Sequence, residues 1–355
     1  MTMRSKRNAY IDLSKGICIS IVMCFHLKEI IPNDCMLAPV AFSACMLPPF
    51  FFLSGLYFKE ESSLSVFMQK KIDRLFIPFT VFYIITAVAV PNMLHFGFGM
   101  KFETVVGWPS LWAFVWPGKY PNIPIWFLWC LFIMSIIFRV LLSFSKAINE
   151  KQHQLILILL CISCAVIGIS LEEYYQTDIA NLFKALKSIP LFCLGYMMSH
   201  VDILSRITSM GIRRKLGGLF AAFSISLLSC LTCDNVWINE VLYYIAGTAG
   251  TALIIILSSI IVQMPLISYL GRYSIIVLLT HGLMVRAGFP LFQNLANTIP
   301  PYISVTAFWI CMACSYFAIV PFCKRFLPYA TAQRPLFYRQ LNHEEGASSL
   351  NKVLP

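Results

Sequence analysis

The sequence predicts an all-α, polytopic membrane protein with about ten transmembrane helices and both termini in the cytoplasm. The first observation is composition: of 355 residues, 59% are hydrophobic and only 12% are charged, whereas a soluble domain carries about 25% charged residues. The second is that the apolar residues form long unbroken blocks, which excludes a β-barrel because barrel strands alternate every second residue. The third is the uneven distribution of Lys and Arg. This composition also excludes a soluble enzyme and a nucleic-acid-binding domain.

A bilayer-spanning helix needs about 20 predominantly apolar residues. Ten blocks fit this template, at 14–34, 37–58, 75–95, 123–143, 153–171, 183–200, 215–232, 240–262, 267–288 and 301–323. The longest loop between them runs from about 95 to 122. We therefore expect one transmembrane domain over residues 1–323, followed by a short polar cytoplasmic tail over residues 324–355.

The basic residues orient these spans. The net charge is +11, and twenty Lys and Arg residues fall on the face that holds both termini, against six on the other face. Because cytoplasmic loops carry the excess of Lys and Arg, both termini are expected in the cytoplasm. Most of the 13 cysteines lie inside apolar blocks, where Cys acts as a small hydrophobic residue, and no metal is expected.

The first span contains ionisable residues, which are costly inside a membrane and are therefore functional candidates. Asp12 and Lys15 lie at its cytoplasmic end, and His26 follows Lys15 by eleven residues. Eleven residues make about three helical turns plus 20°, so Lys15 and His26 share a face and lie about 16 Å apart along the axis. The pattern places a basic group at the mouth of a cavity and an imidazole deeper inside.

The ninth span repeats this arrangement, with Arg272 at the cytoplasmic end and His281 about 13 Å deeper on a straight helix. Ser274 shares the face of His281. Both spans run outward, so the two imidazoles are expected at comparable depth. The alternative for each His is a single interhelical hydrogen bond of the kind that polar residues make in membrane bundles.

A basic cluster stands just before the third span, at Lys70, Lys71 and Arg74. Positive-inside anchoring predicts basic residues here whatever the function. The functional alternative is a phosphate clamp, because Lys71 and Arg74 are one helical turn apart and Arg grips phosphate bidentately.

Together these residues resemble the acyltransferase-3 family of membrane O-acyltransferases. The matching motifs, in chain order, are Asp12-Leu13-Ser14-Lys15-Gly16 with His26; Pro49-Phe50-Phe51-Phe52-Leu53-Ser54-Gly55; Lys71, Arg74, Leu75 and Pro78; Trp126-Phe127-Leu128; and Ser274 with His281. The sequence departs from the family at Leu278, where an aromatic residue is often found.

The resemblance implies a multi-pass enzyme of the bacterial inner membrane. Its donor would be cytoplasmic acyl-CoA, most often acetyl-CoA, and its acceptor a hydroxyl of a surface glycan such as an O-antigen or exopolysaccharide, or of a lipid-linked sugar precursor. No nucleic acid and no metal are implied.

A sugar hydroxyl is a poor nucleophile, so transfer needs a base, and a positioned His contributes about 10²- to 10⁴-fold. His26 is the candidate, either as the base or as a covalent acyl carrier. Asp12 and Lys15 would orient or neutralise groups at the mouth of the site. Lys71 and Arg74 would bind the CoA phosphates. The remaining candidates, expected to line the substrate site, are Ser54, Ser274, His281 and Trp126.

Two rival functions remain from the residues alone. A transporter or flippase of a lipid-linked glycan could also use polar groups inside the membrane, but it predicts Gly- or Pro-broken helices at matching places in two halves, which the sequence does not show. A glycan polymerase would favour a large Arg-rich outer loop, and the loop from 95 to 122 contains no Arg.

Overall fold

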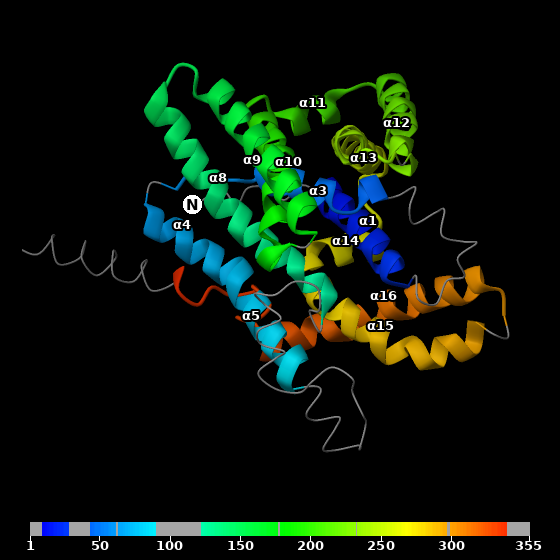
Figure 1. The fold of residues 1–355 in the computed structure, drawn as a ribbon. Helices are drawn as coiled ribbons and strands as arrows, with labels where there is room; N and C mark the ends of the chain where they lie inside the picture. The colour runs from blue at the N-terminus through cyan, green and yellow to red at the C-terminus, as the bar shows by residue number, and fades with distance from the viewer. Residues whose placement is uncertain are drawn as a thin grey trace, which may run out of the picture. The chain divides into compact units, whose positions relative to one another are not determined.

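The structure, a computed structural model, describes residues 9–27, 43–61, 63–89, 122–176, 178–231, 233–296 and 299–338. All regular secondary structure within these ranges is helical, which confirms the predicted all-α fold class (Figure 1). The chain divides into two compact units. The first unit comprises Met1–Phe58 and Pro190–Ala318, and the second comprises Lys59–Ile189 and Ile319–Pro355. Residues 95 to 121 of the outer loop lie outside the described part of the chain.

The first unit is built mainly from α1 and from the helices that follow residue 200. Its elements are α1 (Ala9–His26), η3 (Ser43–Cys45), α3 (Pro48–Leu56), α11 (Ile203–Ser209), α12 (Ile212–Ser226), η8 (Leu227–Cys230), α13 (Val236–Ile261), α14 (Pro265–Arg272) and α15 (Ser274–Ala296). The start of α13 is fixed by Asn235, whose side chain accepts hydrogen bonds from the backbone N–H groups of Trp237 and Ile238.

The second unit consists of a long helical run and a helical hairpin. Its elements are α4 (Leu64–Lys71), η4 (Ile72–Phe76), α5 (Ile77–Ile84), η5 (Ile85–Ala89), η6 (Ile123–Ile125), α8 (Trp126–Ile148), α9 (His153–Tyr175) and η7 (Ile179–Asn181). Both η4 and η5 are π-helical turns. Two further helices, α10 (Leu182–His200) and α16 (Pro301–Phe326), contain the boundaries between the units.

Pairs of glycines allow helices of the first unit to approach closely. A Cβ added to Gly16 in α1 would overlap a backbone oxygen of α14, and a Cβ added to Gly271 in α14 would overlap the backbone oxygen of Asp12. A second reciprocal pair, Gly55 and Gly195, joins α3 to α10 in the same way. Small residues at helix interfaces are the usual means of packing helices within a membrane, because they let the backbones come together.

Within the described residues, five helices are long and apolar enough to cross a membrane, namely α1, α8, α9, α13 and α16, and the pair α14 and α15 would make a sixth. The protein is therefore a multi-pass membrane protein by the length and composition of its helices. The other apolar blocks coincide with helices that do not meet this test, so the count of ten spans and the cytoplasmic termini remain predictions.

The prediction of one straight span over 267–288 is wrong. Helix α14 ends at Arg272, α15 begins at Ser274, and the two are bent by 96°. The reason lies at Tyr273, whose backbone leaves the helical region at φ −111° and ψ 28°. The axial distance expected between Arg272 and His281 on a straight helix therefore does not apply, whereas Ser274 and His281 do lie on one continuous helix.

Candidate active site

The structure brings His26 and His281 into contact within the first unit. His26 is the last residue of α1, and His281 lies in the second turn of α15. The centroids of the two rings are 5.2 Å apart and their planes are inclined by 53°. His281 is fully buried, whereas His26 is half-buried. The two imidazoles that were expected at comparable depth are thus in contact, while their depth in the membrane remains a prediction.

The hydrogen bonds of His281 fix its protonation pattern. Its Nδ1 lies 2.8 Å from the carbonyl oxygen of Val277. A carbonyl oxygen only accepts, so Nδ1 carries the hydrogen and Nε2 of the neutral ring is left as an acceptor. This Nε2 atom is buried and has no hydrogen-bond partner among the residues that the structure describes. His281 therefore offers a lone pair beside the ring of His26.

A tyrosine that sequence reasoning missed supports this arrangement. The hydroxyl of Tyr316, from α16, donates to the same Val277 carbonyl at 3.4 Å and lies 3.1 Å from the hydroxyl of Thr280. Tyr316 is fully buried. It connects α16 to the turn of α15 that carries His281. No signal near Tyr316 in the sequence identifies this partner, because the contact depends on how α16 packs on α15.

The polar residues at the start of α1 lie beside α3 and α14. The ammonium nitrogen of Lys15 is 5.7 Å from the ring centroid of Tyr57, a cation–π contact with the residue that follows α3. Asp12 is half-buried, and its backbone oxygen packs against Gly271. Ser54 donates to the carbonyl of Phe50 in its own helix at 2.7 Å, which leaves its oxygen as an acceptor.

The other three candidates lie in the second unit. Lys71 ends α4 and is half-buried, and Arg74 follows on the π-helical turn η4 and is exposed. Burial, together with the nearby charge of Arg74, lowers the pKa of Lys71 from its usual 10.5 to about 8. Lys71 and Arg74 are three residues apart in a continuous helical run, about one turn, which is the spacing that a phosphate clamp requires. Trp126 begins α8, as predicted, and its ring centroid is 5.3 Å from the ammonium nitrogen of Lys184.

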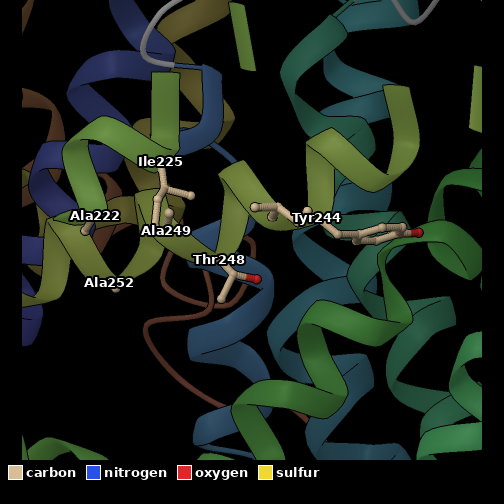
Figure 2. Close-up of a pocket in the computed structure, with 7 residues that line it drawn as sticks. Ala222, Ile225, Tyr244, Thr248, Ala249 and Ala252 are labelled. Carbon is tan, nitrogen blue, oxygen red and sulfur yellow. The ribbon is translucent and has the colours of Figure 1, made fainter. Parts of the chain in front are cut away.

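An apolar groove of about 560 Å³ lies between α12 and α13 and is separate from the paired histidines. Figure 2 shows the small side chains of Ala222, Ala249 and Ala252 close together, with Thr248 near them and the hydroxyl of Tyr244 pointing away from them. No residue that lines it is a cation or a histidine, so it does not suit a phosphate or a proton transfer. His26 and His281 remain the candidates for the chemistry. Among the residues that the structure describes, no cluster of three or more His, Cys, Asp or Glu side chains could hold a metal ion.

The helices and the contacting imidazoles define the class: a multi-pass membrane protein, all-helical over the described residues, with a pair of histidines between α1 and α15. The family follows from comparison with known proteins. The model of the acyltransferase-3 family, described as an acyltransferase domain, matches residues 8–322, and the chain belongs to this family. It is therefore a membrane acyltransferase. Comparison with curated proteins and with solved structures found no match.

Proposed function

We propose that the protein transfers an acyl group, most often acetyl, from cytoplasmic acyl-CoA to a hydroxyl of a cell-surface glycan or of its lipid-linked precursor. The observation that carries this proposal is the contact between His26 and His281 in a chain of the acyltransferase-3 family. We further propose that the enzyme resides in the bacterial inner membrane, with about ten spans and both termini in the cytoplasm.

In the proposed reaction, His26 removes the proton of the acceptor hydroxyl as its oxygen attacks the carbonyl carbon of the thioester. A carbon–oxygen bond forms, the carbon–sulfur bond breaks, and the CoA thiolate leaves and takes up a proton to give free CoA and an ester. His281 accepts a hydrogen bond from the protonated His26 through its unpartnered Nε2. A positioned acceptor of this kind stabilises the imidazolium as it forms.

His26 could act in a second way, by attacking the thioester itself to form an acyl-imidazole that the acceptor then cleaves. The two routes differ in a single-turnover experiment without acceptor. The covalent route releases one equivalent of CoA per enzyme, whereas the general-base route releases none.

The donor is proposed to bind through its phosphates at Lys71 and Arg74. Arg74 is exposed and presents a planar fork of N–H donors, which matches phosphate geometry. Asp12, Lys15, Ser54, Ser274 and Trp126 are proposed to line or orient the substrate site. Replacing Arg74 by Ala should raise the KM for acyl-CoA while leaving the KM for the acceptor unchanged, and the reverse pattern would exclude a CoA clamp.

The test uses purified protein, labelled acetyl-CoA and candidate glycans. We expect His26→Ala to lower transfer by about 10²- to 10⁴-fold. His200→Ala is the matched control, because the imidazole of His200 lies at the end of α10 and hydrogen-bonds to Ser199 and Tyr196 of its own helix. Full activity of His26→Ala would remove this residue from catalysis. No transfer by the wild type to any glycan, together with movement of a lipid-linked glycan, would favour the flippase alternative.

A further inference from the structure

A buried carboxylate lies inside the basic cluster that the proposed function assigns to the donor. Asp73 follows Lys71 by two residues and directly precedes Arg74, and it is only 3% exposed. Its partners come from the end of the described chain. Oδ1 accepts from the backbone N–H groups of Leu336 and Phe337 at 3.1 and 3.0 Å, and Oδ2 accepts from those of Phe337 and Tyr338 at 3.2 and 3.0 Å.

These hydrogen bonds hold the segment Leu336–Tyr338 in place. The side chains of Leu336 and Phe337 are 46% and 43% exposed, so neither is a core residue whose burial alone would anchor the segment. Three successive N–H groups around one carboxylate form an anion-binding concavity, and hydrogen bonds to a charged acceptor are the strong ones. The loss of the Asp73 charge should therefore release the segment.

A second contact joins the same segment to α4. The ammonium nitrogen of Lys70 lies 2.6 Å from Oε1 of Glu61 and 4.6 Å from the ring centroid of Tyr338. Lys70 is thus engaged by an acidic residue and by the segment. Lys71 and Arg74 are the two further cations of the cluster, and the proposed function assigns them to the phosphates.

The docked segment also anchors the backbone that carries the clamp. Asp73 stands between Lys71 and Arg74 in the π-helical turn that Lys71 precedes, and the four hydrogen bonds to its carboxylate come from Leu336–Tyr338. Without the segment this anchor is lost, and the turn that sets the spacing of the two cations is held less firmly.

We propose that Asp73 and the segment Leu336–Tyr338 together form a positioning element that sets the affinity of the Lys71 and Arg74 clamp for acyl-CoA. The inference rests on the proposed function, in which these two cations bind the CoA phosphates. Asp73 is a positioning residue in this scheme and does not itself touch the donor.

The experiment uses the full-length protein and compares three substitutions. Asp73→Asn removes the charge, and Phe337→Pro removes the one N–H group that both carboxylate oxygens share. Phe337→Ala is the matched control, because it keeps this N–H group and loses only an exposed side chain. We expect Asp73→Asn and Phe337→Pro each to raise the KM for acyl-CoA about ten-fold, with kcat and the acceptor KM unchanged. Phe337→Ala should behave as the wild type.

The double variant and a second readout complete the test. Because both substitutions release the same segment, Asp73→Asn with Phe337→Pro should raise the KM no further than either alone. Amide hydrogen exchange in Leu336–Tyr338 should be slow in the wild type and fast in Asp73→Asn.

An unchanged KM for acyl-CoA in Phe337→Pro, or multiplied effects in the double variant, would overturn this inference while leaving the proposed function intact. A wild-type protein that transfers no acyl group from acyl-CoA would overturn the proposed function itself, and this inference with it.

Discussion

The close contact between α1 and α14 at Gly271 gives a prediction that can be worked out from the structure. Replacing Gly271 by Ala would place a methyl group on the backbone oxygen of Asp12 and close to the backbone of Gly16. Neither partner can rotate away, because both belong to helix backbone. The two helices would have to separate by about 1.5 Å to reach ordinary van der Waals contact.

The cost has two parts. Overpacking of a well-packed interface typically costs about 1–3 kcal/mol, which exceeds the gain of about 1 kcal/mol that Ala brings in helix propensity. The separation also moves Asp12, and with it the polar end of α1. A misplacement of about 1 Å in an active site can lower the rate about 10²-fold. We therefore expect a loss of activity larger than the loss of stability alone would produce.

The assay compares Gly271→Ala with Gly217→Ala in detergent. Gly217 lies in α12, and a Cβ there meets no atom within 4 Å, so this control has the same chemistry without the clash. The temperature at which the monodisperse species is lost should fall by about 5 °C in Gly271→Ala and should not fall in Gly217→Ala. Equal stability and equal acyl transfer in the two variants would refute the argument that this glycine is needed for close packing.

Two further predictions follow from the site. Because the pKa of Lys71 is lowered to about 8, its side chain is a charged ammonium group below this pH and loses its proton, and with it the charge, above this pH. The KM for acyl-CoA should then rise several-fold as the pH increases through 8, and a Lys71→Arg variant, which stays charged, should show no such rise; an identical pH profile in both would contradict a phosphate contact. Tyr316→Phe removes a hydroxyl bonded to Val277, so we expect a loss of about 1 kcal/mol in stability and a lower kcat with an unchanged KM for acyl-CoA. Tyr302→Phe, at a position that is 67% exposed, should match the wild type, and equal kcat in the two variants would exclude a role for Tyr316.

The helices could be predicted from the sequence because an unbroken apolar block long enough to span a membrane indicates a helix. The break at Tyr273 could not be predicted in this way. Residues 268–274 are less apolar than the run Ile275–Leu279 that follows, but a drop in hydropathy does not by itself mark a bend, and the break depends on the backbone geometry of one residue. Its position agrees with the packing of α14, since Gly271 is held against α1 just before the chain turns.

The site could be predicted in part. The spacing from Lys15 to His26 and the direction of the spans placed two imidazoles at similar depth, and the structure brings His26 to His281. Tyr316 and the glycine contacts could not be predicted, because nothing in a local pattern states which distant helix will pack there. Asp73 did leave a signal, as a single acidic residue among three cations, but its partners are more than 260 positions away in the chain.

The residues proposed for chemistry and those proposed for donor binding are held by different helices. His26 and His281 depend on α1, α14 and α15 of the first unit. Lys71 and Arg74 depend on α4 and η4 of the second unit, and on the segment that Asp73 holds. Because substitutions at residues that share no partners have independent effects, changes that disturb the α1 interface should appear mainly in kcat, whereas changes at Asp73 should appear mainly in the KM for acyl-CoA. On the proposed mechanism, the protein can therefore vary its affinity for the donor without altering the imidazole pair to which the transfer is assigned.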